Sequence, residues 1–110
     1  MMKIPMSVAA AGLLRSLLAR AGGNRNRFLL IESRSTEWQS LTFVGERHEM
    51  RFRVPGLDAT EIITNLTSRL EDAEFSIPGQ IVADIGLAVP PWRESDGSIT
   101  FELEALTIVE

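Results

Sequence analysis

His48 is the single histidine of this 110-residue chain. Its side chain is the only one whose unperturbed pKa lies near neutral pH. A lone imidazole works as a general base only where a carboxylate orients it and a nucleophile or bound water lies beside it. Glu49 follows directly, but strand alternation points it to the opposite face. The same alternation places His48 with Met50 and Phe52, which favours a hydrogen-bonded histidine at the core.

A small-ligand site near His48 is the alternative interpretation, and Trp38 and Arg47 are its other candidate residues. Arg47 begins a row of alternating arginines that continues at Arg51 and Arg53. Such a row suits an anionic ligand, but it is equally typical of a solvated sheet face.

Glu102 and Glu104 alternate on the outer face of the last expected strand. Residues two apart on a strand are about 6.5–7 Å apart, and the neighbouring Leu103 and Ala105 offer no further catalytic group. We therefore expect these carboxylates to pair with the arginine row across the sheet, and we assign no catalytic residue.

The composition excludes several kinds of site. The chain has no cysteine, which rules out disulfides, thiolate zinc sites, iron–sulfur clusters and cysteine nucleophiles. A single histidine excludes a site built on two histidine ligands from one chain. The sequence contains no glycine-rich phosphate loop, calcium loop or nucleophile elbow. We expect no metal site and no cofactor.

Leucines at helical spacing mark the N-terminal segment. Ser7 is the expected N-cap and Gly22-Gly23 the expected end, so the spacing predicts a helix over residues 7–21. We expect this stripe to pack on the chain's own body or on a second copy. The candidate interface residues of the stripe are Leu13, Leu14, Leu17 and Leu18.

Two other uses of this helix stay open. Its leucines could lie in a membrane surface with its arginines on anionic lipid. Residues 1–21 could instead be a secretory signal cleaved after Ala21, although Arg15 interrupts the apolar region. A cytoplasmic protein is the main expectation, and an exported one is the alternative. No apolar run reaches the roughly 20 residues that a membrane span needs.

Charge is unevenly distributed along the chain. Residues 1–27 hold five of the 11 basic residues and no acidic one, whereas all 15 acidic residues follow. A basic arm can contact phosphates, but no aromatic residue lies between its arginines and the acidic body repels a duplex. We therefore expect no nucleic acid partner.

Trp92 is the remaining candidate interface residue. It follows Pro90-Pro91 in an otherwise polar connection, and exposed tryptophans are frequent at the centre of protein interfaces. The alternative is that its ring folds back over the edge of the sheet.

The body alternates between strand and turn patterns before and after one central helix. Asp58, with Glu61 three residues on, resembles a capping box, and Leu57 can contact Ile62 as a hydrophobic staple. These signals predict a helix over residues 58–74. Strands are expected over residues 28–33, which would be buried on both faces, and over 38–44, 47–54, 80–89 and 98–109, with turns at 34–37, 45–46 and 96–97.

The strand over residues 80–89 is expected to point Ile81, Ala83, Ile85, Leu87 and Val89 inward. In the last strand the apolar alternation changes phase after Leu103. Either a bulge near Glu104-Ala105 or a second buried surface on the opposite face would explain the change.

The expected order is α-β-β-β-α-β-β. It predicts an α+β two-layer sandwich, with a mainly antiparallel sheet of about five strands covered by the central and N-terminal helices. Residues 1–27 form a basic helix and linker, and residues 28–110 form one domain.

Three functional hypotheses follow from these patterns. We favour a non-catalytic interaction module that self-associates as a homodimer. The N-terminal helix carries a leucine stripe, five strands need more cover than one central helix gives, and no catalytic set converges. The first alternative is a small-ligand-binding protein or enzyme with a pocket between helix and sheet near His48. The second is a peripheral membrane or envelope-associated protein that uses residues 1–21.

Overall fold

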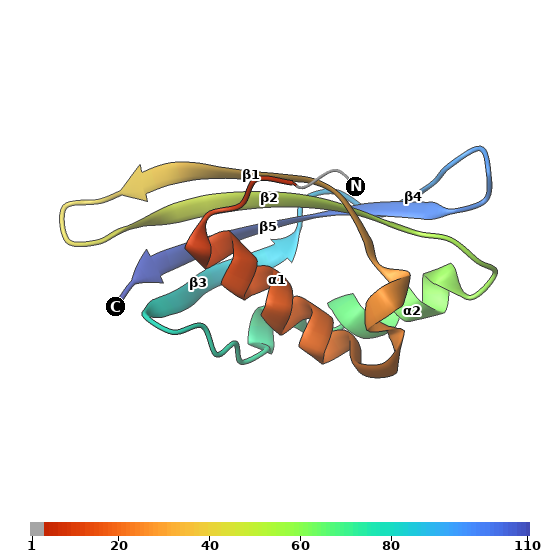
Figure 1. Cartoon of the computed structure of the whole chain (residues 1–110), viewed down its shortest axis with the longest axis horizontal. Coiled ribbons are helices and arrows are strands. Elements are labelled where there is room, and N and C mark those ends of the chain that lie inside the picture. The colour runs from red at the N-terminus through yellow and green to blue at the C-terminus, as the bar shows by residue number, and fades with distance from the viewer. Residues whose placement is uncertain (1–3) are drawn as a thin grey trace.

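A computed structural model describes residues 4–110, which form one antiparallel sheet with two α-helices packed on the same side of it (Figure 1). The strands lie in the order β1-β2-β5-β3, and the short β4 also pairs with β5. The α+β two-layer class is confirmed, but the observed order is α-β-β-α-β-β-β. The elements are α1 (Val8–Ala21), β1 (Leu29–Gln39), β2 (Val44–Val54), α2 (Ala59–Thr67), β3 (Gln80–Leu87), β4 (Trp92–Arg93) and β5 (Ile99–Val109).

Helix α1 begins and ends as its sequence predicts. Ser7 Oγ accepts a hydrogen bond from the backbone N–H of Ala10 at 3.1 Å, which satisfies one free donor of the first turn. Gly22 takes a φ of 60° after the last turn, where a side chain would strain the backbone. The chain then turns through a short 3₁₀ helix, Gly22–Arg27, before entering the sheet.

Strands β1 and β2 form one long hairpin, so the turn predicted at residues 34–37 is wrong. The real turn is Ser40–Phe43, where the backbone N–H of Ser40 donates to the carbonyl of Phe43 at 2.8 Å. Ser40 Oγ also accepts from the N–H of Phe43 at 3.1 Å. The polar stretch of β1 stays extended because β1 is an edge strand with one face open to solvent.

The burial predicted for the first strand is also wrong. Phe28 is buried, but Leu29 and Ile31 are 47% and 45% exposed. The pairing of β1 with β2 shifts between Leu30 and Glu32, which makes Ile31 the extra residue of a bulge.

Helix α2 begins one residue after its predicted start but is shorter than predicted, ending at Thr67. Asp58 makes no side-chain cap hydrogen bond; its carboxylate accepts from Arg27, 2.7 Å away. These hydrogen bonds hold the pKa of the Asp58 carboxyl below its usual range. The expected staple is absent because Leu57 is fully exposed. Beyond the helix, Arg69 adopts a left-handed φ of 53° and the chain continues as a 3₁₀ turn, Leu70–Asp72.

A bulge in β3 changes which residues of this strand face inward. Pairing with β5 shifts between Val82 and Asp84, so Ala83 is the extra residue. Ile85 is buried as predicted, and Leu87 lies on the same face opposite the buried Leu103 but is 38% exposed. The inward predictions for Ile81, Ala83 and Val89 are wrong, since these residues are exposed. The strand ends at Leu87, before Pro90-Pro91, because proline has no N–H to donate to a ladder.

Strand β5 itself carries no bulge against β2. Its pairing is unbroken from Gly45 opposite Ile108 to Val54 opposite Ile99. The apolar alternation of β5 changes because a second residue is buried on the opposite face, where Leu106 is 9% exposed. The turn before β5 is as predicted, with Gly97 at a φ of 91°.

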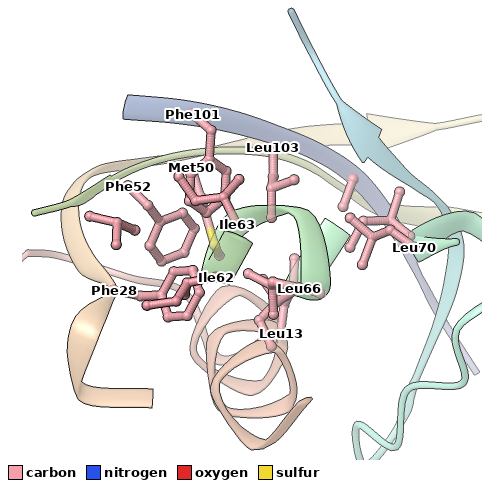
Figure 2. Close-up of a cluster of buried hydrophobic side chains, with 14 of the residues drawn as sticks. Leu13, Phe28, Met50, Phe52, Ile62, Ile63, Leu66, Leu70, Phe101 and Leu103 are labelled. Atoms are coloured by element: carbon pink, nitrogen blue, oxygen red, sulfur yellow. The ribbon is translucent and has the colours of Figure 1, made fainter. Parts of the chain in front are cut away.

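The core lies between the sheet and both helices (Figure 2). Phe52 and Phe101 stack with ring centroids 5.2 Å apart, and Phe28 meets both edge-on. Leu13 of α1 belongs to this cluster, and so do Ile62, Ile63 and Leu66 of α2. The opposite face of the sheet carries no helix from residues 4–110 (Figure 1). We call it the open face.

Candidate functional site

The His48 ring links three strands inside the core. Its Nδ1 lies 2.7 Å from Ser35 Oγ of β1, and its Nε2 lies 2.8 Å from Thr107 Oγ1 of β5. His48 is 1% exposed and Thr107 is fully buried. A neutral imidazole has one donor and one acceptor nitrogen, so one hydroxyl donates to the ring and the other accepts from it. Both nitrogens are therefore satisfied by neighbouring strands.

The ring is held in its neutral form. Burial lowers the pKa of His48, because desolvation penalises the charged ring, and the negative charge of Glu46 opposes this only in part. The Glu46 carboxylate accepts a hydrogen bond from Ser7 Oγ at 2.9 Å, next to the start of α1. A hydroxyl beside an imidazole resembles a nucleophile–base pair, but here the ring is closed to substrate. The two hydrogen bonds of His48 therefore connect β2 to β1 and to β5 and stabilise the sheet.

The three candidate ligand-binding residues do not meet. His48 points into the core, whereas Arg47, its neighbour, is exposed on the other side of β2. Trp38 is half-buried and lies opposite Gly45, on the open face with Arg47. The structure therefore splits these residues between two faces of one sheet.

The candidate interface leucines of α1 face the chain's own body. Leu13 and Leu17 are 2% and 1% exposed within the core cluster, and Leu14 and Leu18 are partly buried against it. The leucine stripe thus covers the sheet of the same chain.

Trp92 lies on the open face, so both tryptophans of the chain are on this side of the sheet. Its Cα lies opposite that of Thr100, and its indole N–H donates to Glu94 at 2.6 Å. Glu94 in turn pairs with Arg53 at 3.2 Å. The three phenylalanines of the core cluster lie on the other face, which separates core aromatics from surface aromatics.

The middle of the open face is a ladder of charges, most of them in ion pairs. The pairing expected for Glu104 is wrong, because Glu104 lies opposite Glu49 and forms no ion pair with an arginine among residues 4–110. Arg51 pairs with Glu102 at 3.1 Å, which confirms the cross-strand pairing expected for that arginine. Arg53 pairs with Glu94 instead, and Arg47 lies opposite Leu106. Each of these half-exposed pairs contributes about 0–1 kcal/mol to stability. The ladder resembles a solvated surface and gathers no excess of positive charge for an anion.

Exposed apolar side chains occur at several places, and four of them lie at the two ends of β1. Leu29 and Ile31, about half exposed, lie at its start, and Leu41 and Phe43 lie in the turn just after its end. Leu41 is fully exposed and Phe43 is 51% exposed. We call these four residues the β1 apolar ends.

Sequence reasoning missed these residues because it assigned Phe28–Ile31 to a central strand. The turn Ser40–Phe43 also lacks the Gly, Asn or Pro that marks most turns. The signal that was available is the polar, extended stretch Ser33–Thr36, which is typical of an edge strand rather than of a turn.

The two edges of the sheet differ. The β3 edge is broken by the bulge at Ala83 and by Pro90-Pro91, which are devices that keep edges from pairing with other chains. Along β1 the pairing with β2 runs without a shift from Glu32 to Gln39, with no proline. No strand among residues 4–110 pairs with its outer side.

One cleft between helix and sheet lies away from His48. It holds about 410 Å³ between α2 and β4, and Thr60, Ile63 and Ile99 line it. Its volume is at the lower end of the range for ligand sites.

Comparisons with known proteins assign no family. The chain matches no protein-family model, and no curated protein is similar to it in sequence. Among residues 4–110, no helix has both the length and the apolar character needed to cross a membrane. Functional inference therefore rests on the surfaces described above.

Proposed function

We propose that this protein is a non-catalytic interaction module that self-associates as a homodimer. The observation that carries the proposal is the exposed apolar surface of the β1–β2 hairpin. Leu41 and Phe43 project from a turn that Ser40 holds in place with backbone and side-chain hydrogen bonds. A fixed turn that presents apolar side chains to water is a costly arrangement unless another surface covers it.

The placement of the chemical groups agrees with a non-catalytic role. The single histidine is occupied by Ser35 and Thr107, and most glutamates of the open face pair with arginines. Glu104 is exposed opposite Glu49.

Glu32, Glu49 and Glu102 line one small hollow of about 180 Å³ on the open face. Arg34 and Arg51 line the same hollow and form ion pairs with these carboxylates.

A cytoplasmic location belongs to this proposal. Cleavage after Ala21 would remove helix α1, which supplies Leu13 and Leu17 to the core. A membrane surface would likewise compete with the sheet for the same leucines. Both considerations favour a chain that keeps its N-terminal helix packed on its own body.

Matched serine substitutions test the proposal. Leu41→Ser and Phe43→Ser together should convert a dimer into a monomer, measured by sedimentation velocity. Leu57→Ser is the control, because Leu57 is equally exposed but lies in the loop before α2. Dimers that persist in the hairpin variant, or a native chain that sediments as a monomer, would contradict the proposal.

A further inference from the structure

We infer that the dimer forms through the outer edge of β1, which pairs antiparallel with the same edge of a second copy, so that the two sheets become one. This inference rests on the proposed self-association and names its surface. Strand addition at a free edge gains backbone hydrogen bonds over the whole paired length. The β1 edge is regular from Glu32 to Gln39, whereas the bulge at Ala83 and the prolines Pro90-Pro91 interrupt the β3 edge.

The β1 apolar ends favour a second copy as the partner. In an antiparallel pair related by a two-fold axis, the start of one strand meets the end of the other, and every contact occurs twice. The exposed Ile31 of one chain is then brought toward the exposed Leu41 of the partner subunit, in the turn that follows the partner's β1. The two-fold axis makes this apolar contact occur twice in the dimer.

Charge restricts the register of this pairing. A two-fold axis perpendicular to the sheet places one residue of β1 opposite itself. Axes at Arg34 or at Glu37 bring like charges together, which is unfavourable. An axis at Ser35 places Glu32 opposite Trp38 of the partner subunit. An axis at Ser33 brings the bulge at Ile31 into the paired segment.

An axis at Thr36 avoids these conflicts. It pairs Thr36 with itself, which is a favourable cross-strand pair. It also sets the Arg34 guanidinium beside the indole of the partner's Trp38, as a cation–π contact requires. Just beyond the paired segment, Ile31 then lies near Leu41 of the partner subunit, in the turn that follows the partner's β1. The paired segment stays within the regular part of β1.

A single cysteine tests the register directly, because the chain has no cysteine of its own. Directly opposite residues in an antiparallel pair have Cα atoms about 4.5–5.5 Å apart, within the range of a disulfide. Thr36→Cys should therefore form a disulfide-linked dimer rapidly under mild oxidation, measured on a non-reducing gel. Ala83→Cys is the control, since Ala83 is exposed on the opposite edge.

A charge reversal tests the same surface without oxidation. Arg34→Glu should weaken dimerisation about tenfold or more, because it replaces the cation over the indole with an anion. Arg25→Glu is the control, with the same change of charge at an exposed position of the 3₁₀ helix. Dimer dissociation constants from sedimentation equilibrium give the comparison, and thermal melts establish that each variant is folded.

The outcomes separate the edge inference from the proposed function. Rapid cross-linking of Thr36→Cys alone, with weakening by Arg34→Glu alone, supports the edge pairing. Equal cross-linking of the two cysteine variants, or an unchanged dimer in Arg34→Glu, overturns the edge pairing. If the native chain is nevertheless a dimer, self-association stands and uses another surface. A monomeric native chain overturns both.

Discussion

At the scale of single residues, His48 is the most deeply buried titratable side chain among residues 4–110, with 1% of its surface exposed. Its two ring nitrogens are bound by hydroxyls from neighbouring strands, and its pKa is lowered by burial. In the unfolded chain the ring returns to its ordinary pKa of about 6.5. Below that pH the unfolded chain binds a proton that the folded chain does not, so acid favours unfolding.

Stability should therefore fall with pH before the carboxylates titrate. We expect the free energy of unfolding to decrease by up to about 1.4 kcal/mol for each pH unit below about 6.5. Urea titrations between about pH 7.5 and pH 5.5 measure this slope. His48→Gln keeps a donor and an acceptor but cannot titrate, and it should flatten the slope. An equal decline in both proteins would show that His48 is not its source.

Gly45 shows how closely β2 approaches β5. A Cβ atom on Gly45 would overlap the carbonyl oxygen of Thr107 and lie 3.0 Å from Cα of Ile108. Gly45→Ala should therefore destabilise the protein by about 1–3 kcal/mol, the usual range for overpacking. In Gly86, a Cβ atom meets nothing within 4 Å, and Gly86→Ala should be neutral or slightly stabilising. Chemical denaturation of both variants checks the contrast, and equal effects would contradict it.

At the scale of elements, helix α1 is part of the fold. Leu17 is 1% exposed in the core cluster, so Leu17→Ala should lower the free energy of unfolding by about 2–5 kcal/mol. Val8 lies on the same helix but is 86% exposed, and Val8→Ala should change stability by less than about 0.5 kcal/mol. Urea midpoints give both values. A Leu17→Ala protein as stable as Val8→Ala would mean that α1 does not pack as described.

The elements also show which local signals were sufficient. Ser7, Gly22 and the leucine stripe predicted α1 correctly. The N-cap residue, the glycine that ends the helix and the apolar face all lie within one short segment, so no distant partner is needed to recognise the helix. The start signals of α2 located that helix, but Asp58 pairs with Arg27, and this partner is distant in sequence. Its end after Thr67, followed by a left-handed Arg69, has no glycine or asparagine to mark it.

The sheet could be predicted only in part. Alternation identified the strands that line the core, including Met50 and Phe52. The bulges at Ile31 and Ala83 were not predictable, because each depends on register with a partner strand. The candidate site could be predicted only in part for the same reason. Strand alternation alone puts Arg47 and His48 on opposite faces, whereas the face of Trp38 depends on the register of the hairpin.

At the scale of the whole molecule, the two faces of the sheet have different neighbours. Both helices cover one face (Figure 1). The phenylalanine cluster lies on this face, and the open face carries both tryptophans and the charge ladder. Packing two open faces together would bury this ladder, which is costly unless every charge stays paired. Edge-to-edge pairing leaves the ladder in water, so it is the association that this charge pattern permits.

Solution mass against concentration is the most direct measurement of the central claim. Light scattering after size exclusion, over roughly 1–100 μM, covers the range in which a moderate dimer dissociates. We predict a mass of twice the 12.2 kDa chain at the upper concentrations, falling toward the chain mass on dilution if the dimer is weak. A mass of 12.2 kDa throughout this range would contradict the account of the protein as a self-associating module.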